Sequence, residues 1–146
     1  MIKLKNKNMV IAELRKKSIL IEKALIYSLG AFVAELENHA KESAEYKDIT
    51  SNLKSSIGGM LLKDGVPVSY KGFVGAPSGA SKGKEFINSL IGNYTSGYTI
   101  LLVAGMEYAS PLENYHGYNV LKKTELKMNR DLPKVLDKLK MQIDRM

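Results

Sequence analysis

One apolar stripe in the first third of the chain constrains the fold more than any other feature. Its members recur at steps of three, four and seven residues: Ile11, Leu14, Ile21, Leu25, Leu29, Phe32 and Leu36. This spacing is typical of one face of an α-helix, and it predicts a long helix over about residues 9–43. Further apolar residues make the stripe wide: Ile19, Leu20, Ile26 and Val33. We therefore expect this helix to be covered on more than one side, in part by a neighbouring subunit.

A two-residue hairpin is predicted in the middle of the chain. Asp64-Gly65 lies between two apolar runs, residues 60–62 and residues 66–70, and Asp-Gly is a strong signal for a type I′ turn. Pro67 has no backbone N–H to donate, which places the second strand at a sheet edge or at a bulge.

Three short segments surround the hairpin. Residues 48–58 predict one or two helical turns, ended by a glycine, that direct Leu53 and Ile57 into the core. Residues 75–83, Gly-Ala-Pro-Ser-Gly-Ala-Ser-Lys-Gly, are small and polar and predict a mobile loop. Residues 85–91 predict a short helix.

The last third of the chain predicts a strand and a helix. Residues 98–104, Tyr-Thr-Ile-Leu-Leu-Val-Ala, are apolar and β-branched, which indicates a buried central strand. A final helix begins at Thr124 or at Asp131; Pro133 fits the first turn in the second case and kinks the helix in the first. The whole chain, residues 1–146, is predicted to be a single α+β domain, in which a long N-terminal helix and a C-terminal helix pack on a small, mostly antiparallel sheet.

The composition excludes several classes of protein. The chain is 45% hydrophobic and 25% charged, as in an ordinary globular protein, and residues 1–8 are expected to be a flexible N-terminus. It has no cysteine, which excludes disulfides and thiolate chemistry. No uncharged run approaches the ~20 residues that span a bilayer, so no membrane partner is expected. The net charge of +7 indicates solvated helix faces, with a nucleic-acid-binding surface as the alternative.

No catalytic constellation is recognisable in the sequence. His39 and His116 are the only histidines, and nothing supplies the second and third ligands that a zinc site needs. No serine has a nucleophile-elbow context, and no Walker-type loop is present. We therefore expect no enzyme activity, metal or cofactor. A hydrolase that uses His116 and Glu113 is a further hypothesis, which loss of activity in His116→Ala would support.

Aromatic residues indicate a binding surface instead. Tyrosine is enriched at protein interfaces because its ring buries a large area while its hydroxyl group stays hydrated; packing over the ends of the sheet is the alternative interpretation. We expect contacts from the hairpin over residues 59–73, the loop over residues 75–83 and the segment over residues 108–118. The candidate interface residues within them are Tyr70, Phe73, Tyr108, Glu113, Tyr115 and Tyr118.

Three sequence elements resemble a known family. Residues 50–57, Thr-Ser-Asn-Leu-Lys-Ser-Ser-Ile, resemble the Thr-Gly-Asn-Leu-basic-x-Ser-Ile element of the head–tail joining, or tail-completion, minor virion proteins of long-tailed phages and prophages, with Ser51 where glycine is usual. Residues 103–109 followed by Glu113 resemble the Tyr-Ala-x-x-Val-Glu signature of the same family, with Pro-Leu before the glutamate. Residues 117–121, Gly-Tyr-Asn-Val-Leu, are similar to the version found in phages and prophages of Bacteroides-type hosts.

The resemblance implies a structural role at the head-to-tail junction. Tail-completion and tail-terminator proteins share an α+β fold and assemble as rings, commonly hexamers. They bind a portal or adaptor protein on one side and the tail-tube protein on the other, and DNA passes through the lumen without sequence-specific binding. The expected location is the neck of the virion, after assembly in the cytoplasm of the bacterial host. The alternative function is a small basic nucleic-acid-binding module.

Overall fold

The computed structural model describes residues 7–42, 52–105 and 121–146. Within these ranges, two long helices, two shorter ones, one 3₁₀ turn and three strands follow one another. Their bounds are α1 (Lys7–Glu42), α2 (Asn52–Ser55), β1 (Ile57–Lys63), β2 (Val66–Gly72), α3 (Pro77–Leu90), the 3₁₀ turn η1 (Ile91–Asn93), β3 (Tyr98–Ala104) and α5 (Lys122–Asp144). The predicted α+β class, with a long N-terminal helix, a C-terminal helix and a small antiparallel sheet, is confirmed.

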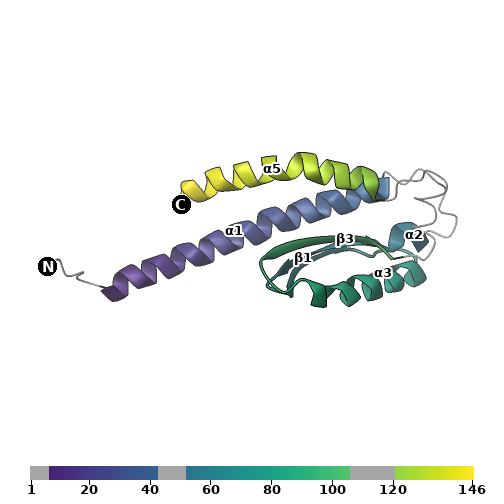
Figure 1. The fold of residues 1–146 in the computed structure, drawn as a ribbon, viewed down its shortest axis with the longest axis horizontal. Coiled ribbons are helices and arrows are strands. Elements are labelled where there is room, and N and C mark those ends of the chain that lie inside the picture. The colour runs from purple at the N-terminus through teal and green to yellow at the C-terminus, as the bar shows by residue number, and fades with distance from the viewer. Residues whose placement is uncertain (1–6, 43–51, 106–120) are drawn as a thin grey trace.

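The elements form layers around the sheet (Figure 1). The three strands are antiparallel in the order β2-β1-β3. Helix α1 crosses one face of the sheet, α3 covers the other face, and α5 lies along α1 (Figure 1). The face toward α3 buries Met60 and Leu62 of β1 beside Ile87. The face toward α1 buries Leu61 against Val33, so the alternation of side chains along β1 supplies both halves of the core.

The predicted strand over residues 98–104 is present as β3, but its central position is wrong. It lies at an edge of the described sheet, and β1 occupies the centre. The chain enters β1 at Ile57, directly after the short helix α2, so Gly58 continues the strand instead of ending a helix. Gly59 lets α1 approach closely, because a Cβ at this position would lie 2.6 Å from Cγ1 of Val33.

The hairpin has the predicted turn. Asp64 and Gly65 both have positive φ, 50° and 82°, as a type I′ turn requires. The register between β1 and β2 shifts between Leu61 and Leu62, where Pro67 lies opposite. Pro67 is therefore both on an edge strand and at a bulge, as predicted.

The loop predicted over residues 75–83 is wrong from Pro77 onward, where α3 begins with proline in its first turn. Its small residues form a buried helix face that admits the ring of Phe73. A Cβ on Gly83 would lie 2.4 Å from Phe73 Cδ1, and one on Gly58 would lie 2.4 Å from Phe73 Cε2. Close packing around this ring overrides the weak helix propensity of the glycines. The helix predicted over residues 85–91 is the last part of α3.

The C-terminal helix begins at Lys122, so the alternative start at Asp131 is wrong and Pro133 lies inside the helix. Its packing face includes Leu132 and Val135, which lie against the core between α1 and the sheet. Leu139 is also buried.

Candidate assembly surfaces

Helix α1 is longer than the sheet on which it packs. Its C-terminal half buries Leu29, Val33 and Leu36. At the hairpin end of β1, Lys63 Nζ donates a hydrogen bond to Glu22 Oε1, and this bond raises the pKa of the lysine. The pair marks the point at which α1 leaves the sheet, and residues 7–21 extend past it (Figure 1).

These residues, here called the projecting segment, expose apolar side chains that continue the core stripe. Every side chain from position 11 to position 20 is exposed. Leu14 is 62% exposed, Ile19 53% and Leu20 51%. Leu14 and Ile21 follow the same stripe as Leu25 farther along the helix. An apolar stripe that is buried at one end of a helix and exposed at the other is a candidate protein-binding surface.

Of the predicted interface residues, the structure describes two. Tyr70, on β2, is 39% exposed, its ring centroid lies 5.4 Å from that of Phe73, and partial burial raises its pKa. Phe73 is only 3% exposed, so its assignment to the interface is wrong: its positive φ of 58° accompanies a ring turned inward between glycines. The candidates Tyr108, Glu113, Tyr115 and Tyr118, like His116 of the hydrolase hypothesis, lie outside the described residues.

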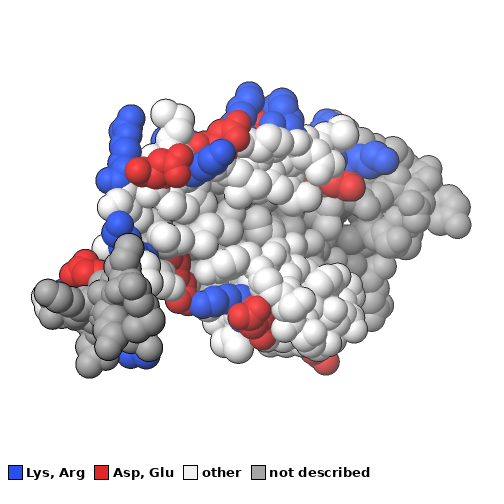
Figure 2. Space-filling model, turned by 60° about the vertical axis from the view of Figure 1, so that its left-hand side comes forward, with Lys and Arg blue, Asp and Glu red and all other residues white. Residues whose placement is uncertain are grey.

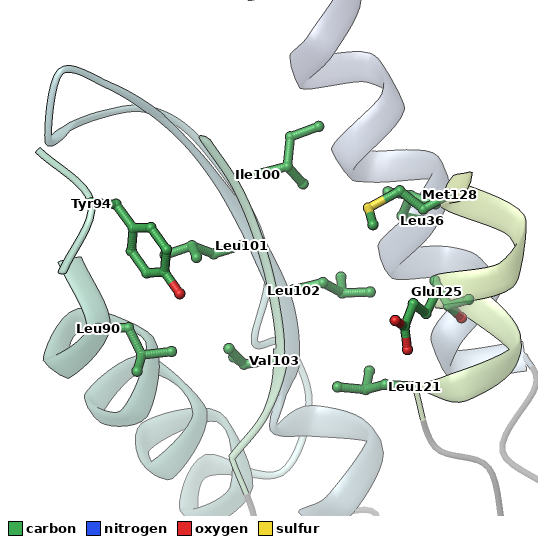
Figure 3. A pocket seen from close by; sticks show the side chains of 11 residues that line it. Leu36, Leu90, Tyr94, Ile100, Leu101, Leu102, Val103, Leu121, Glu125 and Met128 are labelled. Atoms are coloured by element: carbon green, nitrogen blue, oxygen red, sulfur yellow. The ribbon is translucent and has the colours of Figure 1, made fainter. Parts of the chain in front are cut away.

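A groove at the edge of β3 was not predicted from the sequence. It encloses about 340 Å³ and is lined from two sides (Figure 3). Leu90 and Tyr94 approach from α3 and the turn after it, whereas Met128 approaches from α5. The signal in the sequence is that residues 98–104 contain no charge and no proline, two of the features that usually keep an edge strand from pairing with another strand.

Polar contacts fix α5 on α1. His39 Nδ1 lies 2.8 Å from Oγ1 of Thr124, which is fully buried. Lys127 pairs with Glu35 of α1 at 3.2 Å and with Asp131 at 2.8 Å. Hydrogen bonds from Arg130 and from Lys127 lower the pKa of Asp131 to about 2. His39 therefore contributes to helix packing.

The charged groups do not form a uniform basic face in the view of Figure 2, where acidic and basic side chains alternate on the surface. Several cations of the described part are engaged by carboxylates, such as Lys41 by Glu37 at 2.6 Å. No three histidine, aspartate or glutamate side chains of residues 7–42, 52–105 and 121–146 gather in a metal-binding arrangement.

No helix in the described part of the chain has the length and apolar character needed to cross a membrane. Comparisons with protein-family models, with curated proteins and with solved structures give no match for this chain.

Proposed function

We propose that this chain is a non-enzymatic structural protein of the head-to-tail junction of a tailed phage, of the tail-completion or tail-terminator type. Its mechanism is assembly into a ring and docking between a connector and the tail tube. The observation that carries the assembly is the projecting segment, whose exposed apolar stripe continues the core stripe of α1. The placement in a phage neck is supported by the sequence resemblance around residues 50–57 and 103–121.

A contact through the exposed stripe would be of moderate strength. The apolar surface available is about that of two fully exposed side chains, contributed by Ile11, Leu14, Ile19 and Leu20. Burying this surface stabilises a contact by about 3–6 kcal/mol. Association costs about 4–15 kcal/mol in lost freedom of motion. One such contact is therefore marginal. A closed ring, in which every subunit makes two contacts, and additional docking surfaces are needed for a lasting assembly.

The proposal specifies the partners. One side of the ring, expected to be a hexamer, binds the portal or adaptor protein, and the other binds the tail-tube protein. DNA passes through the lumen without sequence-specific binding, for which interleaved charges are better suited than a uniformly basic wall. The assembled protein is located in the neck of the virion after assembly in the bacterial cytoplasm.

The test is co-assembly with the connector and tail-tube proteins that this proposal expects to be encoded beside its gene. The proposal predicts a complex that survives gel filtration, and that Leu14→Lys weakens. A chain that binds neither the connector nor the tail-tube protein would contradict the proposal. Binding of the monomer to DNA, with an affinity that falls steeply as salt rises, would instead favour the small basic nucleic-acid-binding module.

A further inference from the structure

The outer edge of β3 carries backbone groups that no strand of the described residues pairs. Asp64 N donates to Gly97 O at 2.9 Å, and Gly105 N donates to Ser56 O at 3.1 Å. The backbone N–H and C=O groups of the odd-numbered residues of β3 therefore point toward β1. Backbone groups alternate in direction along an antiparallel strand. The N–H and C=O of Ile100 and Leu102 therefore point away from the sheet, where no described strand pairs with them.

The groove follows this edge. Leu101 belongs to the core on the α3 side, whereas Ile100 packs on the α1 side, yet both line the same hollow (Figure 3). A hollow lined by neighbouring residues that point to opposite faces has to run along the edge of the strand. Such a shape accepts an extended peptide, which adds a strand through its backbone and places alternate side chains on the two faces.

The two edges of the sheet differ. The β2 edge carries Pro67 and a bulge, devices that discourage strand addition. The β3 edge has a regular register from Tyr98 to Ala104 and carries neither. An apolar edge with a regular register and no proline is the one that favours addition of a further strand.

We infer that the β3 edge accepts residues 2–5 of a second copy of this chain as a fourth, extended strand. Ile2 and Leu4 alternate with Lys3 and Lys5, so an extended arm presents two apolar side chains on one face and two ammonium groups on the other. The α3 side of the groove is apolar, with Leu90 and Tyr94, and suits the first face. The other side holds the Glu125 carboxylate (Figure 3), which has no ion pair among the described residues and suits a lysine.

The arm has to come from another copy. Lys7, at the start of α1, and Leu36, beside the groove, are separated by roughly 43 Å of helix at a rise of about 1.5 Å per residue. An extended chain from Lys7 back to Ile2 spans at most roughly 18 Å. The contact therefore joins the arm of one copy to the β3 edge of the next, a head-to-tail arrangement that generates rings when the rotation closes. The inference rests on the proposed ring assembly and names the contact that holds it.

The test uses a fluorescent peptide of residues 1–6 and the full-length variant Ile2→Asp/Leu4→Asp, whose own arm no longer competes. The peptide is expected to bind this variant with saturation, and a peptide of the same composition in scrambled order at least tenfold more weakly. Glu125→Gln is expected to weaken binding about two- to fivefold, as for a partly exposed ion pair.

Two further peptides test the strand geometry without altering the protein. N-methyl groups at Ile2 and Leu4 block one edge of the extended arm, and N-methyl groups at Lys3 and Lys5 block the other edge. One of the two peptides is expected to lose binding at least tenfold, and the other to retain it, because only one edge of an added strand faces β3. Equal binding of both, or no binding of the unmodified peptide, would overturn the inference.

The same peptides and protein variants distinguish a failure of this inference from a failure of the proposed function. If the wild-type chain forms a ring and Ile2→Asp/Leu4→Asp forms it equally well, the arm contact is wrong and ring assembly stands. If the wild-type chain stays monomeric while the peptide binds β3 with the expected N-methyl pattern, ring assembly fails and the groove is a strand-binding site.

Discussion

Replacing Gly83 with alanine tests the close packing of α3 against the ring of Phe73, where the sequence predicts a loop. A Cβ at this position would lie 2.4 Å from Phe73 Cδ1 and 2.5 Å from the backbone oxygen of Ser56. The ring is held from its other side by Gly58, and the oxygen accepts a hydrogen bond from Gly105 N, so neither neighbour moves cheaply. Overpacking of this kind costs about 1–3 kcal/mol, and we expect the upper end of that range.

Alanine also favours the helix over glycine by about 1 kcal/mol, which offsets part of the cost. The net expectation for Gly83→Ala is a free energy of unfolding lower by about 2 kcal/mol, measured by urea denaturation followed by circular dichroism. The melting temperature should fall by about 4–8 °C, at about 2–4 °C per kcal/mol for a chain of this size. Gly92→Ala is the matched control, because nothing lies within 4 Å of a Cβ there, and it should be neutral or slightly stabilising. Equal stability of Gly83→Ala and the wild type would refute the close packing of α3.

Three further predictions concern α1 and α5. Leu14→Lys should reduce self-association at least tenfold in sedimentation experiments. Its free energy of unfolding should change by no more than about 0.5 kcal/mol, because the site is exposed. The control Glu13→Lys, which lies off the apolar stripe, should leave self-association unchanged. Thr124→Val should cost about 1–3 kcal/mol in urea unfolding, because it removes the buried hydroxyl that contacts His39; an unchanged midpoint would contradict this role. The folded-state pKa of Asp131 is lowered from 3.8 to about 2. The ionised Asp131 carboxylate should therefore stabilise the fold fully above pH 3.8, and this stabilisation should be lost as the pH falls toward 2. The stabilities of Asp131→Asn and the wild type should converge across that pH window.

The elements that the sequence predicts well are those specified by local patterns. Helix α1 follows from its apolar spacing, and the hairpin follows from Asp64-Gly65, because a type I′ turn depends on the residues that form it. The edge position of β2 was also predictable, since Pro67 lacks the donor that a central strand needs.

The elements that the sequence predicts wrongly depend on contacts between distant segments. The residues from Pro77 to Gly83 are poor helix formers, and they are helical because Phe73 fills the space that their missing side chains leave. The order of the strands depends on long-range pairing, and the apolar character of β3 does not distinguish a central strand from an edge strand covered on both faces. The β3 groove requires α3, β3 and α5 together, so no single stretch of sequence contains it.

Sedimentation velocity of the purified wild-type chain over a wide range of concentrations tests the central claim most directly. Assembly through the projecting segment and the β3 edge predicts a discrete species several times heavier than the 16.2 kDa chain, with a mass that reaches a plateau as a closed ring does. A single 16.2 kDa species at every concentration would contradict the claim.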